Sequence, residues 1–280
     1  MKTQYSIRTL CRVLAVSASG YYAWLERRSA PAPRTRQNQQ LSVLIQEEFK
    51  ASRRTYGSPR ICQALRRSGH VYGRNRIARL MRQQHLSGRP KKRYRVRTTD
   101  SRHDQPIAAN ALATLSAPHR INQAWVADIT YIATGEGWLY LAGVMDLYSR
   151  KIIGWSMSSN LDTSLVLASW QMALLRRPAA GQLLFHSDRG CQYASAEFRQ
   201  SLQQHGALAS MSRKANCYDN AAMESFWSTL KLELIYRRQF ATRAQAQTEI
   251  FAFIEGFYNR TRLHSSLNYL SPVDFENQNN

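Results

Sequence analysis

The chain has 280 residues, 44% of them hydrophobic, which is enough to bury a substantial core in about two domains. Its 39 Lys and Arg against 18 Asp and Glu give a formal net charge of +21, which is unlike a metabolic enzyme and favours nucleic acid or, alternatively, a membrane surface as the partner. The four cysteines form no Cys-x-x-Cys pair, and no apolar run approaches the ~20 residues of a membrane helix. We therefore expect no zinc site, no disulfide framework, no membrane span and a cytoplasmic location.

The positive charge lies mostly in the first part of the chain. Met1–Gln105 hold 24 Lys and Arg against 5 Asp and Glu, and the remainder is nearly neutral. A charge run is usually a solvated face, but an asymmetry of this size favours a DNA-binding module followed by a separate domain.

The N-terminal segment, residues 1–36, has the pattern of two short helices and a linker. Both helices are predicted within Ser6–Arg28, with Ser17 as the cap of the second. This is the size of a helix-turn-helix, and a plain helical hairpin fits the pattern equally well. The proline-containing stretch Ser29–Arg36 is typical of a linker.

A basic helical module is predicted over residues 37–97. Its three helices are expected at Leu41–Lys50, Ser58–Arg67 and Asn75–Gln84. The last helix is basic on one side and apolar on the other, which suits a DNA groove or a phosphate backbone. Arg89–Arg97, with six basic residues in nine, is expected to touch DNA, the alternative being a solvated tail. The DNA contacts predicted in this module are Arg76, Arg79, Arg82, Lys91, Lys92 and Arg93.

After a polar linker at residues 98–121, the pattern changes to that of an α/β domain, residues 122–280. Strands are predicted at Ala124–Ala133, Trp138–Leu147, Lys151–Ser158, Leu183–Ser187 and Leu208–Met211, and helices at Ser164–Arg177, Ala194–Gln204, Asn220–Tyr236 and Ala244–Arg260. This order is that of a ribonuclease H-like fold, a mixed five-stranded sheet with flanking helices.

Three acidic residues in this domain are candidates for a metal site. Asp128 lies in a strand of apolar neighbours, where a carboxylate is costly unless a cation or donors compensate it. Asp188 ends the fourth strand, where open α/β sheets place ligands, and Glu224 comes early in a helix. Each alone is more often structural, for example in a pairing of Asp188 with Arg189. Together they form the oxygen ligand set expected for two Mg²⁺ ions, or Mn²⁺ in their place, in phosphodiester cleavage.

Basic and amide side chains near these acids are candidates for DNA contacts. Asn220, Glu224 and Lys231 share one helix face, because Asn220 lies one turn before Glu224 and Lys231 two turns after it. The predicted contacts to phosphates near the scissile bond are Asn220, Lys231, Arg213 and Lys214.

Other polar residues of the domain are assigned to structure. Asp146 ends the second strand and is expected to contact Ser149 or Arg150 rather than metal. His264 is expected to pack or to contact DNA. Glu233 lies nine residues after Glu224, which turns it away from the metal site.

Several stretches of the domain resemble a known family. They are Trp125–Tyr131, Trp138–Trp155, His186–Tyr193, Ser210–Lys231, and Tyr258–Leu267 followed by Ser271-Pro272. With 35 residues between Asp188 and Glu224, they resemble the integrase core of insertion sequence 3 family transposases, the second-frame product often called OrfB, with its D,D(35)E signature. Cys191 and Ala215 depart from the family pattern at positions that are not expected to ligate metal.

The resemblance implies a DNA transposase whose catalytic acids are Asp128, Asp188 and Glu224, with Lys231 as the family's basic residue. It also implies cleavage at element ends, transfer of the freed 3′-hydroxyl, an OrfA or OrfAB fusion partner, and a homo-oligomer on DNA. Two alternatives stay open, a non-catalytic DNA-binding regulator and a retrovirus-like integrase. The second would carry a His/Cys zinc module, for which no spacing exists before Asn122.

Overall fold

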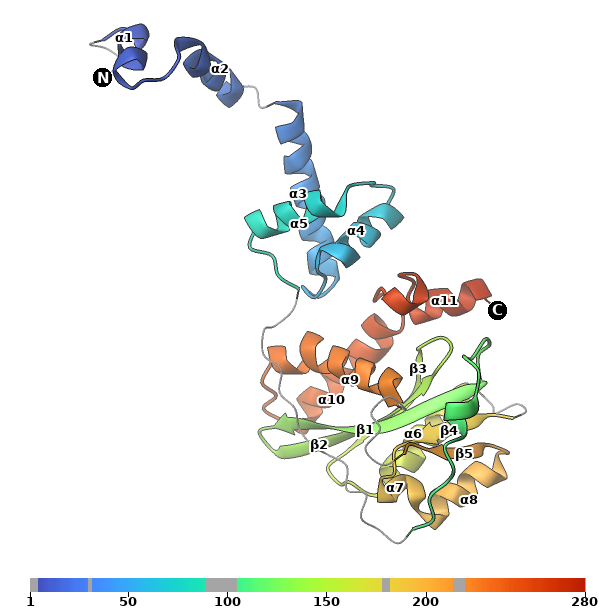
Figure 1. Cartoon of the computed structure of the whole chain (residues 1–280). Coiled ribbons are helices and arrows are strands. Elements are labelled where there is room, and N and C mark those ends of the chain that lie inside the picture. Colours follow the sequence, from blue (N-terminus) through green and yellow to red (C-terminus); the bar gives the residue numbers. More distant parts are fainter. Residues whose placement is uncertain (1–4, 30–31, 89–104, 178–181, 214–219, 280) are drawn as a thin grey trace. The chain divides into compact units, whose positions relative to one another are not determined.

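The computed structural model describes residues 5–29, 32–88, 105–177, 182–213 and 220–279. The chain divides into two compact units, residues 1–88 and 89–280 (Figure 1). Of the predicted DNA contacts, Lys91, Lys92, Arg93 and Lys214 lie outside the described residues.

Unit 1 begins with the two short helices that the sequence predicts, α1 (Ile7–Val13) and α2 (Ala18–Ser29). Ser17 caps the second helix as expected, since its Oγ accepts a hydrogen bond from the main-chain N of Gly20 at 3.0 Å.

The third helix, α3 (Pro33–Ala51), is longer than predicted. It begins inside Ser29–Arg36, so the prediction of a linker is wrong from Pro33 onward. Proline is favoured in the first turn of a helix, because its missing N–H leaves nothing unpaired there. Two further helices, α4 (Ser58–Arg67) and α5 (Arg74–Gln83), follow close to the predicted bounds.

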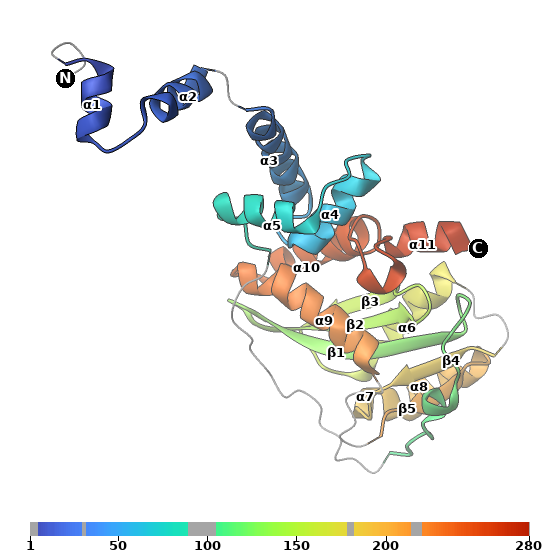
Figure 2. The same ribbon diagram turned by 45° about the horizontal axis from the view of Figure 1, so that its top comes forward.

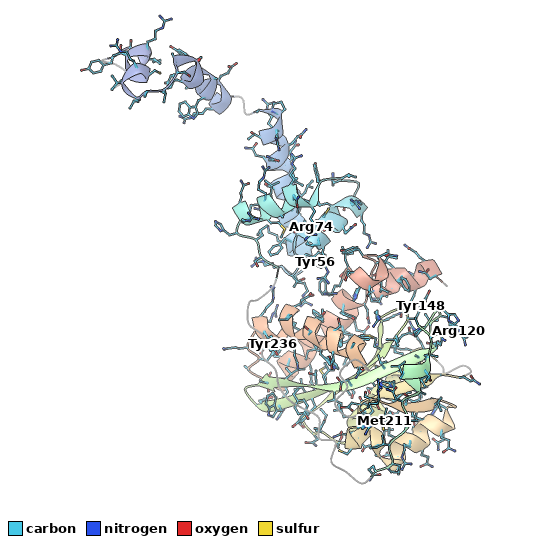
Figure 3. The ribbon with its side chains drawn as sticks, viewed as in Figure 1. Tyr56, Arg74, Arg120, Tyr148, Met211 and Tyr236 are labelled. Carbon is cyan, nitrogen blue, oxygen red and sulfur yellow. The ribbon has the colours of Figure 1, made fainter. Side chains whose placement is uncertain are left out.

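These three helices pack around one apolar core. Tyr56, between α3 and α4, is buried beside it (Figure 3). The most buried side chains, each at most 4% exposed, are Leu41, Ile45, Ile61, Leu65, Ile77, Leu80 and Met81. Burial of the last three confirms the apolar side that the sequence predicts for α5.

Unit 2 is built on a mixed five-stranded sheet, as predicted, with the strand order β3-β2-β1-β4-β5. The strands are β1 (Ala124–Thr134), β2 (Gly137–Asp146), β3 (Ile152–Ser158), β4 (Leu184–Ser187) and β5 (Leu208–Met211). The first three are antiparallel neighbours, and β4 runs parallel to both β1 and β5.

Helices cover both faces of this sheet, as Figures 1 and 2 show from two directions. One face carries α6 (Thr163–Arg176) and α8 (Ala196–Gln204), and the other carries α9 (Ala221–Glu233) and α10 (Arg243–Phe251). The apolar core under α6 and α8 includes Trp125, Trp170 and Phe185. This layering confirms the predicted ribonuclease H-like class.

The helices of unit 2 differ from the prediction in three places. The helix predicted over Ala194–Gln204 is confirmed as α8, which Ser195 caps, and a short helix that the sequence did not predict, α7 (Cys191–Ala194), precedes it. The helix α10 continues as a π-helix over Ala252–Tyr258. A last helix, α11 (Pro272–Asn279), is not predicted at all. None of the helices in the described ranges is long and apolar enough to cross a membrane.

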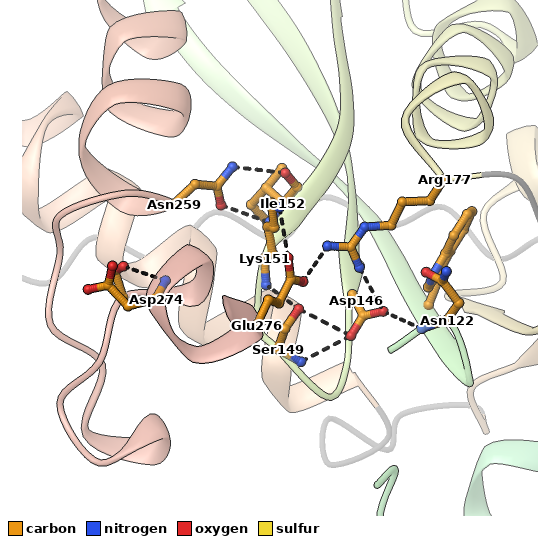
Figure 4. Close-up of polar contacts among 11 residues, drawn as sticks. Asn122, Asp146, Ser149, Lys151, Ile152, Arg177, Asn259, Asp274 and Glu276 are labelled. Carbon is orange, nitrogen blue, oxygen red and sulfur yellow. Dashed lines mark hydrogen bonds and ion pairs between the residues drawn. The ribbon is translucent and has the colours of Figure 1, made fainter. Parts of the chain in front are cut away.

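A buried ion network holds α11 against the sheet (Figure 4). Glu276 of α11 pairs with Arg177, whose second nitrogen lies 3.2 Å from an oxygen of Asp146. Burial raises the pKa of Glu276, but hydrogen bonds from Arg177 and other partners hold it below its usual value. Asp146 is fully buried and accepts main-chain hydrogen bonds from Asn122 at 2.7 Å and Ser149 at 3.0 Å. The predicted structural contact of Asp146 to Ser149 is confirmed.

Candidate active site

Asp128 lies in the middle of β1, where its carboxylate contacts α9. Its Oδ2 accepts a hydrogen bond from the indole Nε1 of Trp227 at 3.0 Å, and its Oδ1 accepts one from the main-chain N of Ile129 at 2.8 Å. Gly143 stands directly opposite on β2. A Cβ atom there would lie 3.0 Å from the Trp227 ring, so glycine leaves room for the ring to reach the carboxylate.

Asp188 follows the last residue of β4 and stands beside Asp128. The parallel register pairs Val126 of β1 with His186 of β4, which places the two aspartates two residues further along neighbouring strands. The Oδ1 atom of Asp188 accepts a hydrogen bond from the main-chain N of Gly190 at 3.0 Å. This is the carboxyl end of β4, as the sequence predicts.

Glu224 is exposed in the first turn of α9 and completes the group of three acids. The pKa of Asp128 is raised to about 8, first by burial, then by the charge of Asp188 and more weakly by that of Glu224, against the effect of its two hydrogen bonds. Since a carboxylate raises a neighbour's pKa strongly only at short range, Asp188 lies close to Asp128, and the weaker effect of Glu224 places its carboxylate farther away. Among the described residues, no three His, Cys, Asp or Glu side chains are placed so that they could hold a metal ion.

Asn220 precedes α9 and is buried, with only 7% of its surface exposed. Its Nδ2 donates to the main-chain O of Ala127 at 3.2 Å, which joins α9 to β1 one residue before Asp128. Because a carbonyl oxygen can only accept, this bond fixes which amide atom is the nitrogen. The remaining atom, Oδ1, is buried and has no hydrogen-bond partner in the part of the chain that the structure describes. Asn220 thus lies against β1, whereas the sequence analysis placed it on DNA.

Two basic residues that the sequence predicts as DNA contacts, Lys231 and Arg213, lie in the described part of this unit. Lys231, two turns beyond Glu224, is half-buried; burial lowers its pKa, and the charge of Asp128 partly restores it. Its ammonium group therefore lies within electrostatic reach of Asp128. Arg213 is exposed shortly after β5.

Glu233 and His264 make structural contacts instead of facing the acids. Glu233 is buried and forms two bonds of 2.8 Å with the guanidinium of Arg262. The Nε2 atom of His264 lies 3.2 Å from the main-chain O of Tyr258, and the two rings pack edge to face. These positions agree with the sequence analysis.

The three arginines predicted to bind DNA from α5 differ in exposure. Arg79 and Arg82 are exposed. Arg76 is half-buried, because its Nε donates to Oδ1 of Asn38 at 2.9 Å and its guanidinium stands 5.4 Å from the centre of the Tyr72 ring. Arg76 therefore joins α5 to α3, and Arg79 and Arg82 are the two of this group that remain exposed for a phosphate contact.

Replacing both Arg79 and Arg82 by Glu is expected to weaken binding of the full chain to duplex DNA and to flatten its salt dependence. Each lost phosphate contact should reduce the slope of log affinity against log salt by about 0.9. Fluorescence anisotropy of a labelled duplex at several salt concentrations measures this slope. Arg76→Ala is the control: it should lower the melting temperature and leave the slope of the salt dependence unchanged. An unchanged slope in the double variant would remove both arginines from the DNA interface.

Comparison with known proteins places the chain among DNA-recombining enzymes. Residues 118–217 and 205–272 match integrase core domain families, and residues 36–94 match an HTH-like domain. The chain is 44% identical over 267 residues to the insertion element IS600 uncharacterized 31 kDa protein of Shigella sonnei, covering 95% of this chain and 97% of that protein. It is 39% identical over 278 residues to transposase InsF for insertion sequence IS3A of Escherichia coli strain K12, covering 99% and 96%.

A likeness to solved structures is more distant. A chain of the simian T-cell lymphotropic virus intasome, in complex with PP2A regulatory subunit B56 gamma, is 14% identical with a TM-score of 0.48, over 77% of this chain and 70% of that chain. This likeness is too remote to inform the site.

The five-stranded sheet and the two core matches define an integrase-core protein with an HTH-like region before the core. The HTH-like match falls on α3, α4 and α5 rather than on α1 and α2, the segment that has the size of a helix-turn-helix. Identity to transposase InsF over nearly the whole of both chains is more specific. The chain belongs to the insertion sequence 3 family of transposases, and the resemblance seen in the sequence is confirmed.

Proposed function

We propose that the chain is a DDE-type polynucleotidyl transferase that cleaves DNA at the ends of an insertion sequence and transfers the freed 3′-hydroxyl to target DNA. Its catalytic acids are Asp128, Asp188 and Glu224. The observation that carries the proposal is the position of Asp128 and Asp188 on neighbouring strands, near enough for Asp188 to raise the pKa of Asp128, in a chain of a transposase family.

The donor atoms around Asp128 suit a hard divalent cation. They are the carboxylate oxygens of the three acids and the unpartnered Oδ1 of Asn220, and oxygen ligands are those that Mg²⁺ and Mn²⁺ prefer. The pKa of Asp128 is raised first by burial and then by the charge of Asp188, and a bound cation would offset both effects. Two such ions would activate the attacking oxygen and stabilise the leaving one during phosphodiester cleavage.

Other side chains of the protein would orient the catalytic acids and bind the DNA. The indole N–H of Trp227 fixes the orientation of the Asp128 carboxylate. Lys231, within reach of the same acid, is suited to a DNA phosphate beside the scissile bond. Unit 1 would hold the duplex through exposed residues such as Arg79 and Arg82. We further propose, from the family resemblance, that the chain acts as a homo-oligomer on DNA together with OrfA or as an OrfAB fusion.

The decisive experiment is a cleavage assay with the purified full chain, alone and together with OrfA or as the OrfAB fusion. The substrate is a duplex carrying the end sequence of the proposed insertion sequence, and the expected product is a nick with a 3′-hydroxyl that appears with Mg²⁺ and disappears with EDTA. A non-catalytic regulator would bind the same duplex without cutting it, in Mg²⁺ or Mn²⁺.

Asn220→Ala is expected to reduce the rise in melting temperature that Mn²⁺ causes in the absence of DNA. A bound cation at free concentration c stabilises the fold by RT ln(1 + c/Kd), so a weaker site that has lost an oxygen donor gives a smaller rise. Asn259→Ala is the matched control, because buried Asn259 uses both amide atoms on the main chain of Ile152, at 3.0 and 2.9 Å (Figure 4). Both variants should lose stability in EDTA. If both keep the same Mn²⁺ rise as the wild type, Asn220 serves only to join α9 to β1.

A further inference from the structure

A hollow of about 700 Å³ lies at the edge of the sheet beside the candidate active site. The strand β4 pairs only with Ala124–Val126 of β1, so in the described part of the chain the second half of β1 pairs with β2 alone. The hollow lies beside this half of β1. The end of α9 and the following 3-10 helix, Ile235–Arg237, form its other side. Figure 3 shows Tyr236 there, beside the β1–β2 hairpin.

The hollow adjoins the acids through two of its lining residues. Lys231 comes from the same helix as Glu224, and Tyr131 comes from the same strand as Asp128, three residues further on. Burial lowers the pKa of Lys231 and raises that of Tyr131; the charge of Asp128 acts on both, as the weakest of several causes at Tyr131. The hollow therefore begins on the helix and the strand that carry Glu224 and Asp128, although none of the three acids lines it.

Aromatic rings form much of the wall. Trp138 is 45% exposed and Tyr236 is 38% exposed, so both offer ring surface to solvent. The Tyr131 ring packs edge-on against Trp138, with centroids 6.1 Å apart, and thereby supports it. Phe240 contributes a further ring and is itself buried. Exposed aromatic rings next to a phosphate-handling site are the usual platform for stacking an unpaired base.

Two cationic residues line the hollow, Lys231 and Arg238, and none of its lining residues is acidic. Arg238 is paired with Glu249 outside the lining, so Lys231 is the cation that a ligand would meet. An apolar peptide would use the rings but gain nothing from the cation, and a free anion would use the cation but gain nothing from the rings. A nucleotide uses both, and the volume lies within the range of small-molecule sites.

We propose that this hollow binds an unpaired nucleotide of the DNA strand next to the scissile phosphate, with its base stacked on Trp138 and Tyr236 and its phosphate beside Lys231. The choice of DNA as the ligand rests on the proposed function. Removing a base from the duplex costs stacking energy, and stacking on the two rings compensates for that loss. The site would hold the strand end open while the neighbouring phosphate lies at the acids.

A fluorescent base reports directly on this site. The probe is a duplex with a short single-stranded overhang carrying 2-aminopurine, whose fluorescence falls when the base stacks, mixed with the full chain in metal-free buffer so that nothing is cut. We expect quenching with the wild type and with Trp138→Phe, and its loss with Trp138→Ala and Tyr236→Ala. Affinity for the overhang duplex should fall about tenfold in Trp138→Ala, the effect of losing one stacked base, while affinity for a blunt duplex is unchanged.

Phe251→Ala is the control, because Phe251 on α10 is 52% exposed and lies outside the hollow. Quenching and overhang affinity that persist in a Trp138→Ala, Tyr236→Ala double variant would overturn the proposal. A change in oligomeric state without a change in overhang binding would also overturn it and identify the hollow as a protein interface. Wild-type quenching without Mg²⁺-dependent cleavage would sustain the nucleotide site and refute the proposed activity, so the two failures are distinguishable.

Discussion

Asp128→Asn is expected to abolish both strand cleavage and transfer of a pre-cut 3′-hydroxyl, while duplex binding is kept or improved. Asparagine retains the shape and the acceptor for the Trp227 indole, but it removes the charge that a cation requires. We expect rates to fall by on the order of 1,000-fold or more, equivalent to ~4 kcal/mol of transition-state stabilisation. Gel assays on intact and pre-cut element ends measure the two steps separately.

Asp162→Asn is the matched control for this variant. Asp162 is an exposed acid of the same unit whose carboxylate accepts the main-chain N–H of Leu165 at the start of α6. Asparagine caps a helix about as well as aspartate, so activity and stability should stay near wild type. Strand transfer by Asp128→Asn on pre-cut ends would show that the two steps use different sites.

The same substitution should change how stability depends on pH in metal-free buffer. The folded-state pKa of Asp128 is about 8, above the ordinary value near 4, so the folded chain favours the protonated acid. Stability from this group is present at low pH and is lost as the pH rises from about 4 through about 8. Asp128→Asn lacks this loss, so its melting temperature should exceed that of the wild type above pH 8.

Local sequence patterns were sufficient for the sheet and insufficient for the last helix. The five strands are rich in β-branched and aromatic residues and are bounded by turn residues, so each was placed within a residue or two of its observed bounds. The helix α11 has little apolar periodicity of its own. It is held by Glu276, whose partners Lys151 and Arg177 lie about 100 residues away, and no local pattern reports such a contact.

The candidate site also has features that the sequence predicts and features that depend on tertiary packing. The spacing of Asp188 and Glu224 and the burial of the strand around Asp128 are visible along the chain, and the three acids could be named from them. The role of Trp227 depends on Gly143 standing opposite Asp128, which follows from the β1–β2 register and from how α9 docks. Docking also explains Asn220: the shared helix face was predicted, but its burial against β1 was not.

The third acid can be identified by comparing two glutamates of α9. Glu224→Gln is expected to reduce cleavage by on the order of 1,000-fold with the metal-free melting temperature unchanged or raised, because an exposed carboxylate that repels Asp128 is neutralised. Glu233→Gln should instead keep cleavage and lower the melting temperature.

Glu233 forms two buried bonds to Arg262, and Glu233→Gln takes away the charge that compensates the buried guanidinium. Breaking such a pair costs about 3–5 kcal/mol, or roughly 10 °C in melting temperature for a unit of this size. Cleavage by the folded fraction should nevertheless persist in Mg²⁺ at low temperature. Asp219, the other acid near Glu224, lies outside the described residues, and Asp219→Asn is expected to retain strand transfer. Near-normal cleavage by Glu224→Gln, together with an inactive but folded Glu233→Gln or Asp219→Asn, would assign the third carboxylate elsewhere.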